Sequence, residues 1–245
     1  MTDTAVEKTL AVLEALADHS RIADIARVTG LPKSTVHRLL RAMVDRGFAT
    51  AAPDGYLTGP RVLALAGKVL RPLDTVERAR PSLRALQQST DCTVHLAVLF
   101  GDELVYVDKI EADKPYRMAS RPGMSLPAHG TAIGKAVLAS FSPSELDAYV
   151  SRTGLPGRTP RTITSPARLV SQLTRVRRSR FALDDEENEV GVRCVGSAIR
   201  DHSGAVIGGL SASSLAMEHS LSELIALGPR VLRAADEVSA ALGWL

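Results

Sequence analysis

Residues 22–43 of the chain read IADIARVTGLPKSTVHRLLRAM, and this stretch decides the fold of the N-terminal part. Its first half predicts a short helix that stops at Gly30, because glycine readily adopts the left-handed conformation found at helix C-termini. Pro32 suits the first turn of the next helix, where its missing N–H group costs nothing. That helix has the i, i+3, i+4, i+7 spacing of a buried face, formed by Val36, Leu39, Leu40 and Met43. The stretch therefore predicts a helix-turn-helix.

A further helix precedes this motif and a hairpin follows it. Steps of four, three and four between apolar residues predict that the preceding helix buries a face formed by Val6, Leu10, Leu13 and Ala17. After the motif, Asp54-Gly55 lies between two β-prone segments and predicts a tight hairpin. Residues 1–58 are therefore predicted to form a winged helix-turn-helix domain. Residues 59–72 are rich in leucine and predict a linker helix that Pro72 ends.

Residues 73–245 predict a second, larger domain. Short turns between β-rich segments predict antiparallel hairpins at 93–110 and 192–213, and residues 116–119 are a candidate further strand. Helices are expected at residues 131–140, after Ser142-Pro143, after Ser165-Pro166 and at residues 222–242. Consecutive hairpins around a helical middle predict an antiparallel sheet with flanking helices, so the fold class is α+β.

The composition excludes several classes of protein. With 45% hydrophobic and 23% charged residues, the 245-residue chain is neither disordered nor fibrous. Two cysteines are too few for a disulfide framework, and no apolar run suits a signal peptide or a membrane helix. We therefore expect a cytoplasmic protein without a membrane partner. The first 72 residues carry ten Lys and Arg against seven Asp and Glu, whereas the rest carries twenty of each. This distribution favours an anionic partner for the N-terminal domain, such as nucleic acid.

The helix expected after Pro32 carries side chains that can read DNA. At about 100° per residue, the face opposite its apolar stripe holds Ser34, Arg38 and Arg41, flanked by Lys33, His37 and Thr35. Arginine can pair with guanine in the major groove, and serine or threonine can contact base edges or phosphates. An ordinary solvated helix face is the alternative. The neighbouring short helix and hairpin favour the DNA-reading interpretation.

Motifs along most of the chain resemble one family. They lie, in order, in residues 22–40, 56–59, 95–98, 105–109, 126–135 and 189–194. Together they resemble the IclR-type bacterial transcriptional regulators. The resemblance implies a ligand-responsive DNA-binding regulator, expected to repress a metabolic operon by binding double-stranded operator DNA. It also implies a C-terminal domain similar to a GAF-type small-molecule sensor, with a pocket on one face of the sheet.

The resemblance places an effector pocket in this second domain. It implies apolar walls at Met118, Leu126 and Val192, helix-start amides near Ala132 and Ile133, and polar groups from Asp184, Cys194, Ser211 and Ser213. Free amides at a helix start attract anions, and two serines two apart on a strand face the same side. Such donors beside apolar walls predict a small carboxylic acid as effector. From their spacing alone, the two serines could instead line a polar sheet face.

The sequence gives weaker support for a metal site, a cation site or a catalytic site. Cys92 and His95 have a metal-like spacing, but further ligands are lacking, so neither a metal nor a cofactor is expected. The acidic residues 184–189 are expected to form a mostly solvated loop with only Asp184 turned to the pocket, and a cation site is the alternative. The alternative function is a cysteine-dependent hydrolase that uses Cys194 with His129 as base. No catalytic signature supports it, so an enzyme is not expected.

A single reading module contacts too few base pairs to select a site in a genome. We therefore expect a homodimer that reads two half-sites. The apolar residues of the first and linker helices could supply its surface, and the resemblance implies dimers that pair into tetramers.

Overall fold

The computed structural model describes residues 4–70 and 74–244. The chain divides into two compact units, Met1–Asp74 and Thr75–Leu245. Within the described residues, no helix is long and apolar enough to cross a membrane. Pro72, which is predicted to end the linker helix, lies outside the described residues.

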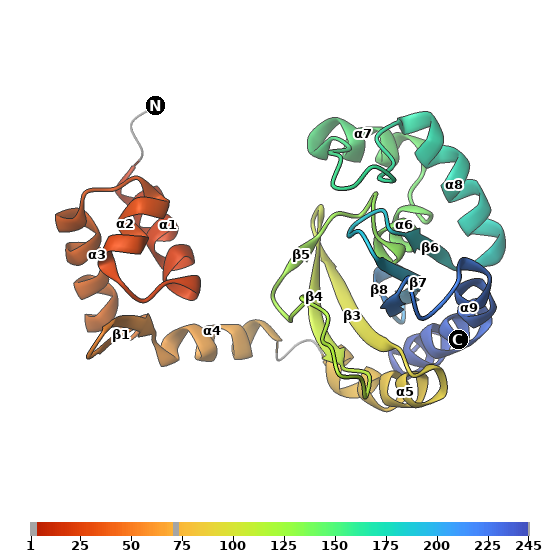
Figure 1. Cartoon of the computed structure of the whole chain (residues 1–245), viewed down its shortest axis with the longest axis horizontal. Coiled ribbons are helices and arrows are strands. Elements are labelled where there is room, and N and C mark those ends of the chain that lie inside the picture. Colours follow the sequence, from red (N-terminus) through yellow and green to blue (C-terminus); the bar gives the residue numbers. More distant parts are fainter. Residues whose placement is uncertain (1–3, 71–73, 245) are drawn as a thin grey trace. The chain divides into compact units, whose positions relative to one another are not determined.

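The N-terminal unit packs short helices against a hairpin (Figure 1). A capping box starts α1 (Ala5–Asp18), because the Thr4 side chain accepts the N–H of Glu7 and the Glu7 carboxylate accepts the N–H of Thr4. Gly30 ends α2 in the left-handed conformation with φ 68°, as the sequence predicts. The other elements are α2 (Ile22–Thr29), α3 (Lys33–Asp45), β1 (Ala49–Ala52), β2 (Gly55–Thr58) and α4 (Pro60–Leu70).

The core of this unit confirms one predicted face and corrects another. All four apolar residues predicted on α3 are buried: Val36, Leu39, Leu40 and Met43. On α1 the predicted face is wrong, because Val12, Ala15 and Leu16 are buried while Val6 is 67% and Leu10 53% exposed. The helix carries two apolar stripes, and only the one on its C-terminal half meets α2 and α3. The other stripe remains uncovered in the single chain.

The predicted hairpin is present, with its turn one residue earlier than Asp54-Gly55. Ala52 pairs with Gly55, so Pro53 and Asp54 form the turn. Gly55 has φ 142°, and a Cβ atom there would lie 2.2 Å from the carbonyl oxygen of Ser20. The N–H of Tyr56 donates to the same oxygen at 2.9 Å. The hairpin is therefore fixed against the segment between α1 and α2, and only glycine fits that approach.

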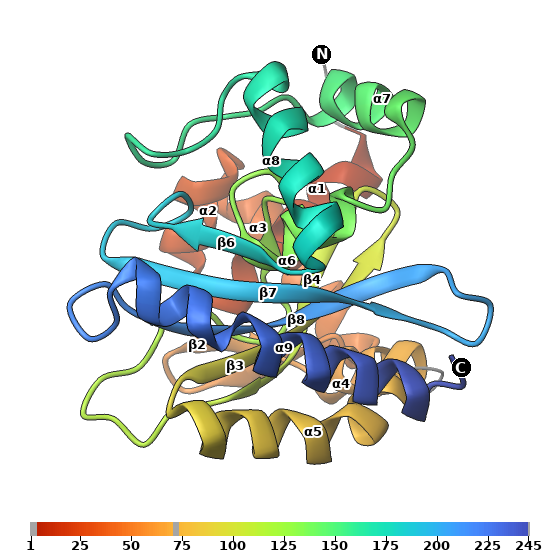
Figure 2. The same cartoon turned by 90° about the vertical axis from the view of Figure 1, so that its right-hand side faces the viewer.

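The C-terminal unit is an antiparallel sheet with helices on both faces, which confirms the α+β class (Figure 2). Its strand order is β5-β4-β3-β8-β7-β6. The strands are β3 (Thr93–Phe100), β4 (Glu103–Ile110), β5 (Ser125–Leu126), β6 (Ala182–Asp185), β7 (Val192–Arg200) and β8 (Val206–Leu215). The helices are α5 (Asp74–Thr90), α6 (Ala132–Leu138), α7 (Pro143–Thr153), α8 (Pro166–Ser179) and α9 (Leu221–Ala241).

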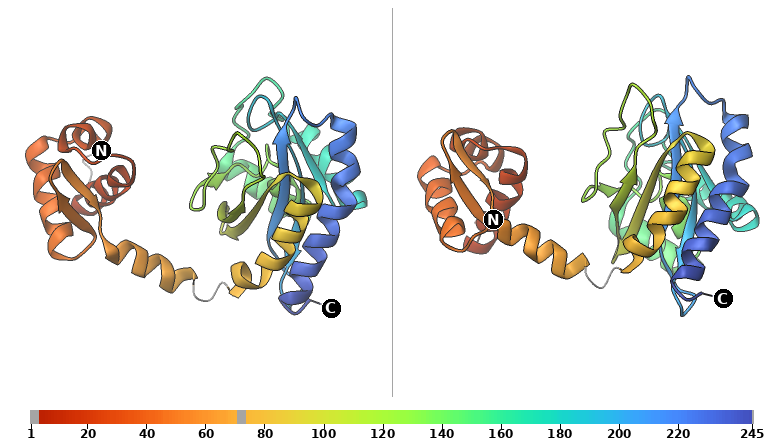
Figure 3. Two further views of the ribbon diagram at one scale, coloured as in Figure 1. Left: turned by 60° about the horizontal axis from the view of Figure 1, so that its bottom comes forward. Right: turned by 90° about the horizontal axis from the view of Figure 1, so that it is seen from below.

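Two hydrophobic clusters lie on opposite faces of this sheet. Helices α5 and α9 lie side by side on one face (Figure 3), where their apolar residues pack on β3, β7 and β8. Helices α6, α7 and α8 share the second cluster with Ala97, Leu104 and Leu126 on the opposite face. The two predicted Ser-Pro starts are confirmed, since Pro143 and Pro166 begin α7 and α8.

Two short segments differ from the sequence prediction. Residues 116–119 are irregular, because the Lys109 ammonium group binds the carbonyl oxygens of Met118 and Ser120, each at 2.7 Å. The Lys109 side chain thus supplies the hydrogen-bond donors that a neighbouring strand would otherwise provide to these carbonyl oxygens. Strand β6, which the sequence did not predict, is a four-residue edge strand that contains two acidic residues. Its composition resembles that of a loop.

Candidate functional sites

Helix α3 presents its predicted polar face to solvent. Lys33, Ser34, His37, Arg38 and Arg41 are exposed and Thr35 is half-buried. Pro32 is the N-cap residue of α3 and lies one position before the expected first turn. In the part of the chain that the structure describes, no carboxylate forms an ion pair with Lys33, Arg38 or Arg41. The cationic face of α3 is therefore available to an anionic partner.

A cavity of about 110 Å³ lies on the α6 face of the sheet in the C-terminal unit. Its walls come from α6, from all six strands of the sheet, from the segment before β5 and from the segment between α7 and α8. All nine residues predicted for an effector pocket line it: Met118, Leu126, Ala132, Ile133, Asp184, Val192, Cys194, Ser211 and Ser213. The sequence resemblance thus identified residues that the fold brings to one place.

The strand register explains how the floor of the cavity forms. Ser213 on β8 pairs with Cys194 on β7, which pairs with Asp184 on β6. These residues lie on adjacent strands and form one row across the sheet. Helix α6 covers the floor closely, since a Cβ atom on Gly196 would lie 2.9 Å from the backbone nitrogen of Ile133. Gly196 pairs with Ser211, so the first amides of α6 are held above the neighbouring row, which contains Ser211.

Several lining residues were not predicted as pocket residues, and His95 on β3 is the most informative. Hydrogen bonds join its ring to the hydroxyl groups of Ser120 at 2.7 Å and Ser213 at 3.3 Å. The ring of Tyr106 packs 4.9 Å from it, centroid to centroid. Burial, helped by the charge of Lys109, lowers the pKa of His95 to about 3, so this imidazole is neutral. In the sequence, the feature that could have identified His95 as a pocket residue is its position within an otherwise apolar strand.

The proposed metal spacing of Cys92 and His95 does not bring the two side chains together. Cys92 packs in the cluster beneath α5 and α9, whereas His95 lines the cavity on the other face. Residues three apart along an extended segment point to opposite sides of a sheet, which accounts for the separation. Within the described residues, no group of three or more His, Cys, Asp and Glu side chains could hold a metal ion.

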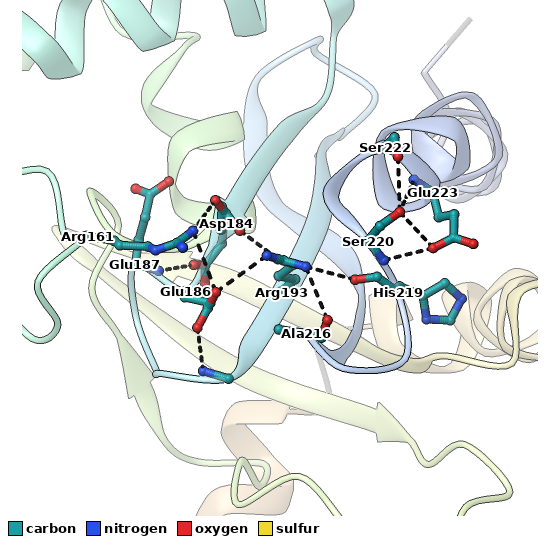
Figure 4. A network of polar contacts seen from close by, with 12 residues as sticks. Arg161, Asp184, Glu186, Glu187, Arg193, Ala216, His219, Ser220, Ser222 and Glu223 are labelled. Carbon is teal, nitrogen blue, oxygen red and sulfur yellow. Dashed lines mark hydrogen bonds and ion pairs between the residues drawn. The ribbon is translucent and has the colours of Figure 1, made fainter.

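The acidic segment 184–189 is not the mostly solvated loop that we expected. Glu187 is buried, and its Oε1 lies 2.5 Å from Nζ of Lys135, which is fully buried on α6. Arg193 reaches Asp185 at 2.6 Å and donates to the carbonyl oxygens of Ala216 and His219 (Figure 4). The cations that surround the segment were not recognisable from spacing, because they come from α6, the α7–α8 segment and β7.

Asp184 is the buried carboxyl group of the cavity. Its Oδ1 accepts the backbone N–H groups of Glu187 at 2.7 Å and Asn188 at 3.3 Å. Burial outweighs these hydrogen bonds and raises the pKa of Asp184 to about 7. The group is therefore close to its midpoint of ionisation at neutral pH.

The arrangement does not support a Cys194 nucleophile with His129 as base. Burial, together with the charge of Asp184, raises the pKa of the Cys194 thiol well above its usual range, which disfavours the thiolate. His129 instead forms a hydrogen bond with the carbonyl oxygen of Pro156 at 3.0 Å and lines a different cavity. A cysteine hydrolase needs the two side chains within hydrogen-bond reach.

Comparison with known proteins identifies both units. A family model described as the IclR helix-turn-helix domain matches residues 5–53, and one described as the bacterial transcriptional regulator IclR C-terminal domain matches residues 67–240. The HTH-type transcriptional regulator XynR of Escherichia coli is 35% identical, with 98% of this chain and 97% of that protein covered. The acetate operon repressor of Salmonella typhimurium is 31% identical over 96% of this chain and 88% of its own length.

A solved structure shares the fold over nearly the whole chain. It is an IclR homolog from Microbacterium hydrocarbonoxydans complexed with 4-hydroxybenzoate. The TM-score is 0.83 at 26% identity, with 98% of this chain and 99% of that chain covered.

We predict that Asp184 makes stability depend on pH. Between about pH 4 and pH 7 the unfolded chain loses the Asp184 proton while the folded protein keeps it, because its pKa is raised from 3.8 to about 7. The free energy of unfolding should therefore fall as pH rises through this window, by roughly 2–4 kcal/mol, and level off above it. In Asp184→Asn this part of the slope should disappear, as measured by denaturant unfolding at several pH values.

Asp147→Asn is the control, because Asp147 is exposed on α7. It should follow the wild-type curve. An Asp184→Asn curve parallel to that of the wild type would contradict the assignment.

Proposed function

Because the chain belongs to the IclR family of bacterial transcriptional regulators, we propose that it represses a metabolic operon and responds to a small carboxylic acid. The single observation that carries this proposal is the convergence of all nine expected effector residues on one cavity. A related protein is named as a repressor, and another is bound to an organic acid, which supports both parts. As a bacterial regulator that binds DNA, the protein would act in the cytoplasm.

The proposed DNA-reading residues are those on the exposed face of α3. Arg38 and Arg41 would approach base edges in the major groove, while Lys33, Ser34, Thr35 and His37 contact bases or phosphates. Support comes from their exposure and from the absence of carboxylate partners for the three cations within the described ranges. The hairpin would lie over the DNA backbone beside α3.

The proposed effector class follows from the balance of donors and acceptors in the cavity. The first amides of α6 lack partners within the helix, and the hydroxyl groups of Ser211 and Ser213 lie on the floor below. Against these donors stands Asp184, which is partly protonated at neutral pH. Donors in excess bind an anionic oxygen group, while Met118, Leu126 and Val192 contact its carbon part.

The proposed assembly is a homodimer that joins two reading units. Val6 and Leu10 on α1 are exposed, and on α4 Leu63 is 76% and Leu65 54% exposed. Large apolar side chains exposed together mark an interaction surface, and a twofold axis lets one such surface pair with itself. Pairing of such dimers into tetramers would involve the C-terminal units.

Arg38 should contribute sequence-specific binding. We predict that Arg38→Ala weakens binding to a selected operator by roughly 1–3 kcal/mol and reduces the preference over random DNA, because a guanine contact is lost. Arg46→Ala is the control, since Arg46 lies at the end of α3 and away from this face. Mobility-shift titrations measure both variants. Wild-type affinity and selectivity of Arg38→Ala would exclude the assignment.

Ser213 should contribute to effector binding and not to DNA binding. A bound carboxylic acid at 100 times its dissociation constant stabilises the protein by roughly 2.7 kcal/mol. In Ser213→Ala much of this stabilisation should be lost in thermal-shift assays, while the ligand-free protein still binds its operator. Ser214→Ala is the matched control, because Ser214 points to the opposite face, toward His219. An equal ligand shift in Ser213→Ala and wild type would refute the role.

Association should depend on the exposed leucines of α4. We expect light scattering to show an oligomer of wild type at micromolar concentration and a shift toward monomer in Leu63→Glu. Leu57→Glu is the control, because Leu57 on β2 is also exposed, at 54%, and this variant should associate normally. Footprints should show half-sites spaced by about 10 base pairs or a multiple of it. A wild-type monomer bound tightly to one half-site would rule out this assembly.

A further inference from the structure

His95 joins the floor of the effector cavity to another of its walls. The residue lies on β3, is only 3% exposed and lines the cavity. Its Nδ1 atom lies 3.3 Å from the hydroxyl oxygen of Ser213 on the floor. Its Nε2 atom lies 2.7 Å from the hydroxyl oxygen of Ser120, which belongs to the β4–β5 segment, residues 111–124. The two nitrogens of one ring therefore contact two different walls of the cavity.

The β4–β5 segment is attached to the sheet at this place by a second residue. Lys109 on β4 pairs with His95 on β3, so the two side chains lie next to each other on one face of the sheet. The Lys109 ammonium group donates to the carbonyl oxygens of Met118 and Ser120, each at 2.7 Å. Lys109 thus holds the backbone of the segment, whereas His95 contacts the Ser120 side chain and, through its other nitrogen, the floor.

The ring of His95 is neutral, which limits it to one donor and one acceptor. Burial, helped by the charge of Lys109, lowers the pKa of His95 to about 3. In a neutral imidazole one nitrogen carries the hydrogen and the other carries a lone pair. The tautomer of the ring therefore decides which of the two serines, Ser120 or Ser213, donates a hydrogen bond to His95 and which one accepts a hydrogen bond from it.

The two tautomers give the cavity floor opposite properties. When Nδ1 carries the hydrogen, it donates to Oγ of Ser213, so the hydroxyl hydrogen of Ser213 is available to a ligand, and Nε2 accepts the hydroxyl of Ser120. When Nε2 carries the hydrogen, the Ser213 hydroxyl donates to Nδ1 and offers a ligand only lone pairs. The thiol of Cys194, which pairs with Ser213 across the strands, is a weak acceptor and competes little for this hydrogen. An anionic oxygen at Ser213 therefore requires the first tautomer.

We infer that His95 is the positioning residue of the effector site: through Nδ1 it makes Ser213 a hydrogen-bond donor to the ligand, and through Nε2 it holds the β4–β5 segment. This inference rests on the proposed function, which requires an anionic ligand at Ser213 and assigns no role to His95. The ring of Tyr106 packs 4.9 Å from the His95 ring, centroid to centroid, and fixes its plane. His95 acts through Ser213, as a residue that orients a ligand-binding group does.

The tautomer of His95 can be measured without changing the protein. Calorimetry on the full chain first selects the acid that binds most tightly among pyruvate, hexanoate, benzoate and 4-hydroxybenzoate. NMR of the imidazole nitrogens is then recorded at a saturating concentration of that acid, and the His95 signals are assigned through their proximity to the Tyr106 ring. We expect a protonated Nδ1 and an unprotonated Nε2. A protonated Nε2 overturns the inference.

Two amide variants separate the roles of the two nitrogens. The amide of asparagine lies near the position of Nδ1 and that of glutamine near the position of Nε2, so His95→Asn keeps the contact with Ser213 and His95→Gln keeps the contact with Ser120. We expect the affinity for the acid to stay within about twofold of wild type in His95→Asn and to fall roughly three- to tenfold in His95→Gln, the effect of one hydrogen bond. His202→Asn and His202→Gln are the matched controls, because His202 is exposed between β7 and β8, and both should bind as wild type.

The attachment of the β4–β5 segment is measured by proteolysis of the ligand-free protein. Trypsin can cut this segment only after Arg117, which is exposed, because its two other basic residues precede proline. Cleavage after Arg117 should be roughly three- to tenfold faster in His95→Asn than in wild type, and unchanged in His95→Gln. Ser120→Ala should match His95→Asn, and it leaves the buried strand intact if the His95 variants fail to fold.

The outcomes separate this inference from the function on which it rests. Weaker acid binding in His95→Gln alone, together with faster cleavage in His95→Asn alone, supports both. Equal effects of the two substitutions, or a cleavage rate of Ser120→Ala equal to that of wild type, overturn the role of His95 and leave a carboxylate effector standing. If wild type binds none of the four acids, both the inference and the proposed effector class are overturned.

Discussion

The cavity depends on one buried ion pair, that of Lys135 and Glu187. Lys135 belongs to α6, which covers the cavity, and Glu187 belongs to the segment that forms its β6 wall. Both side chains are buried, so either charge alone would be strongly destabilising, and loss of one partner of such a pair costs about 3–5 kcal/mol. The Thr162 hydroxyl donates to the Glu187 carbonyl oxygen, which adds the segment of Arg158 to the same junction. This ion pair and one hydrogen bond therefore join three walls of the cavity.

The two units use their basic residues differently. In the C-terminal unit, arginines such as Arg152, Arg180 and Arg193 form ion pairs with neighbouring carboxylates and stabilise the fold. On α3 the cations have no such partners within the described residues and remain available to DNA. The excess of positive charge within the first 72 residues agrees with this difference between the two units.

Sequence patterns predicted best where a single physical requirement acts on neighbouring residues. The face of α3 around Leu39 and Leu40 is such a case, because the helical spacing of its apolar residues and their packing in one hydrophobic core determine it. The α1 face was wrong because apolar spacing does not distinguish a stripe that packs within the chain from the exposed one that carries Val6. The resemblance identified the cavity floor, but Arg158 was missed, since its place in the wall depends on contacts between segments distant in sequence.

This division between floor and wall also explains how one fold can serve different ligands. Ser211, Ser213 and Cys194 are fixed by strand pairing, so changing their positions would disturb the sheet. Arg158 and Asn188 lie on connecting segments, where a substitution alters the lining of the cavity without changing the strand register. A relative with 26% identity keeps a TM-score of 0.83, so the backbone persists while most side chains differ. Ligand selectivity is therefore expected to reside in the connecting segments, because strand pairing holds the lining residues of the sheet in fixed positions.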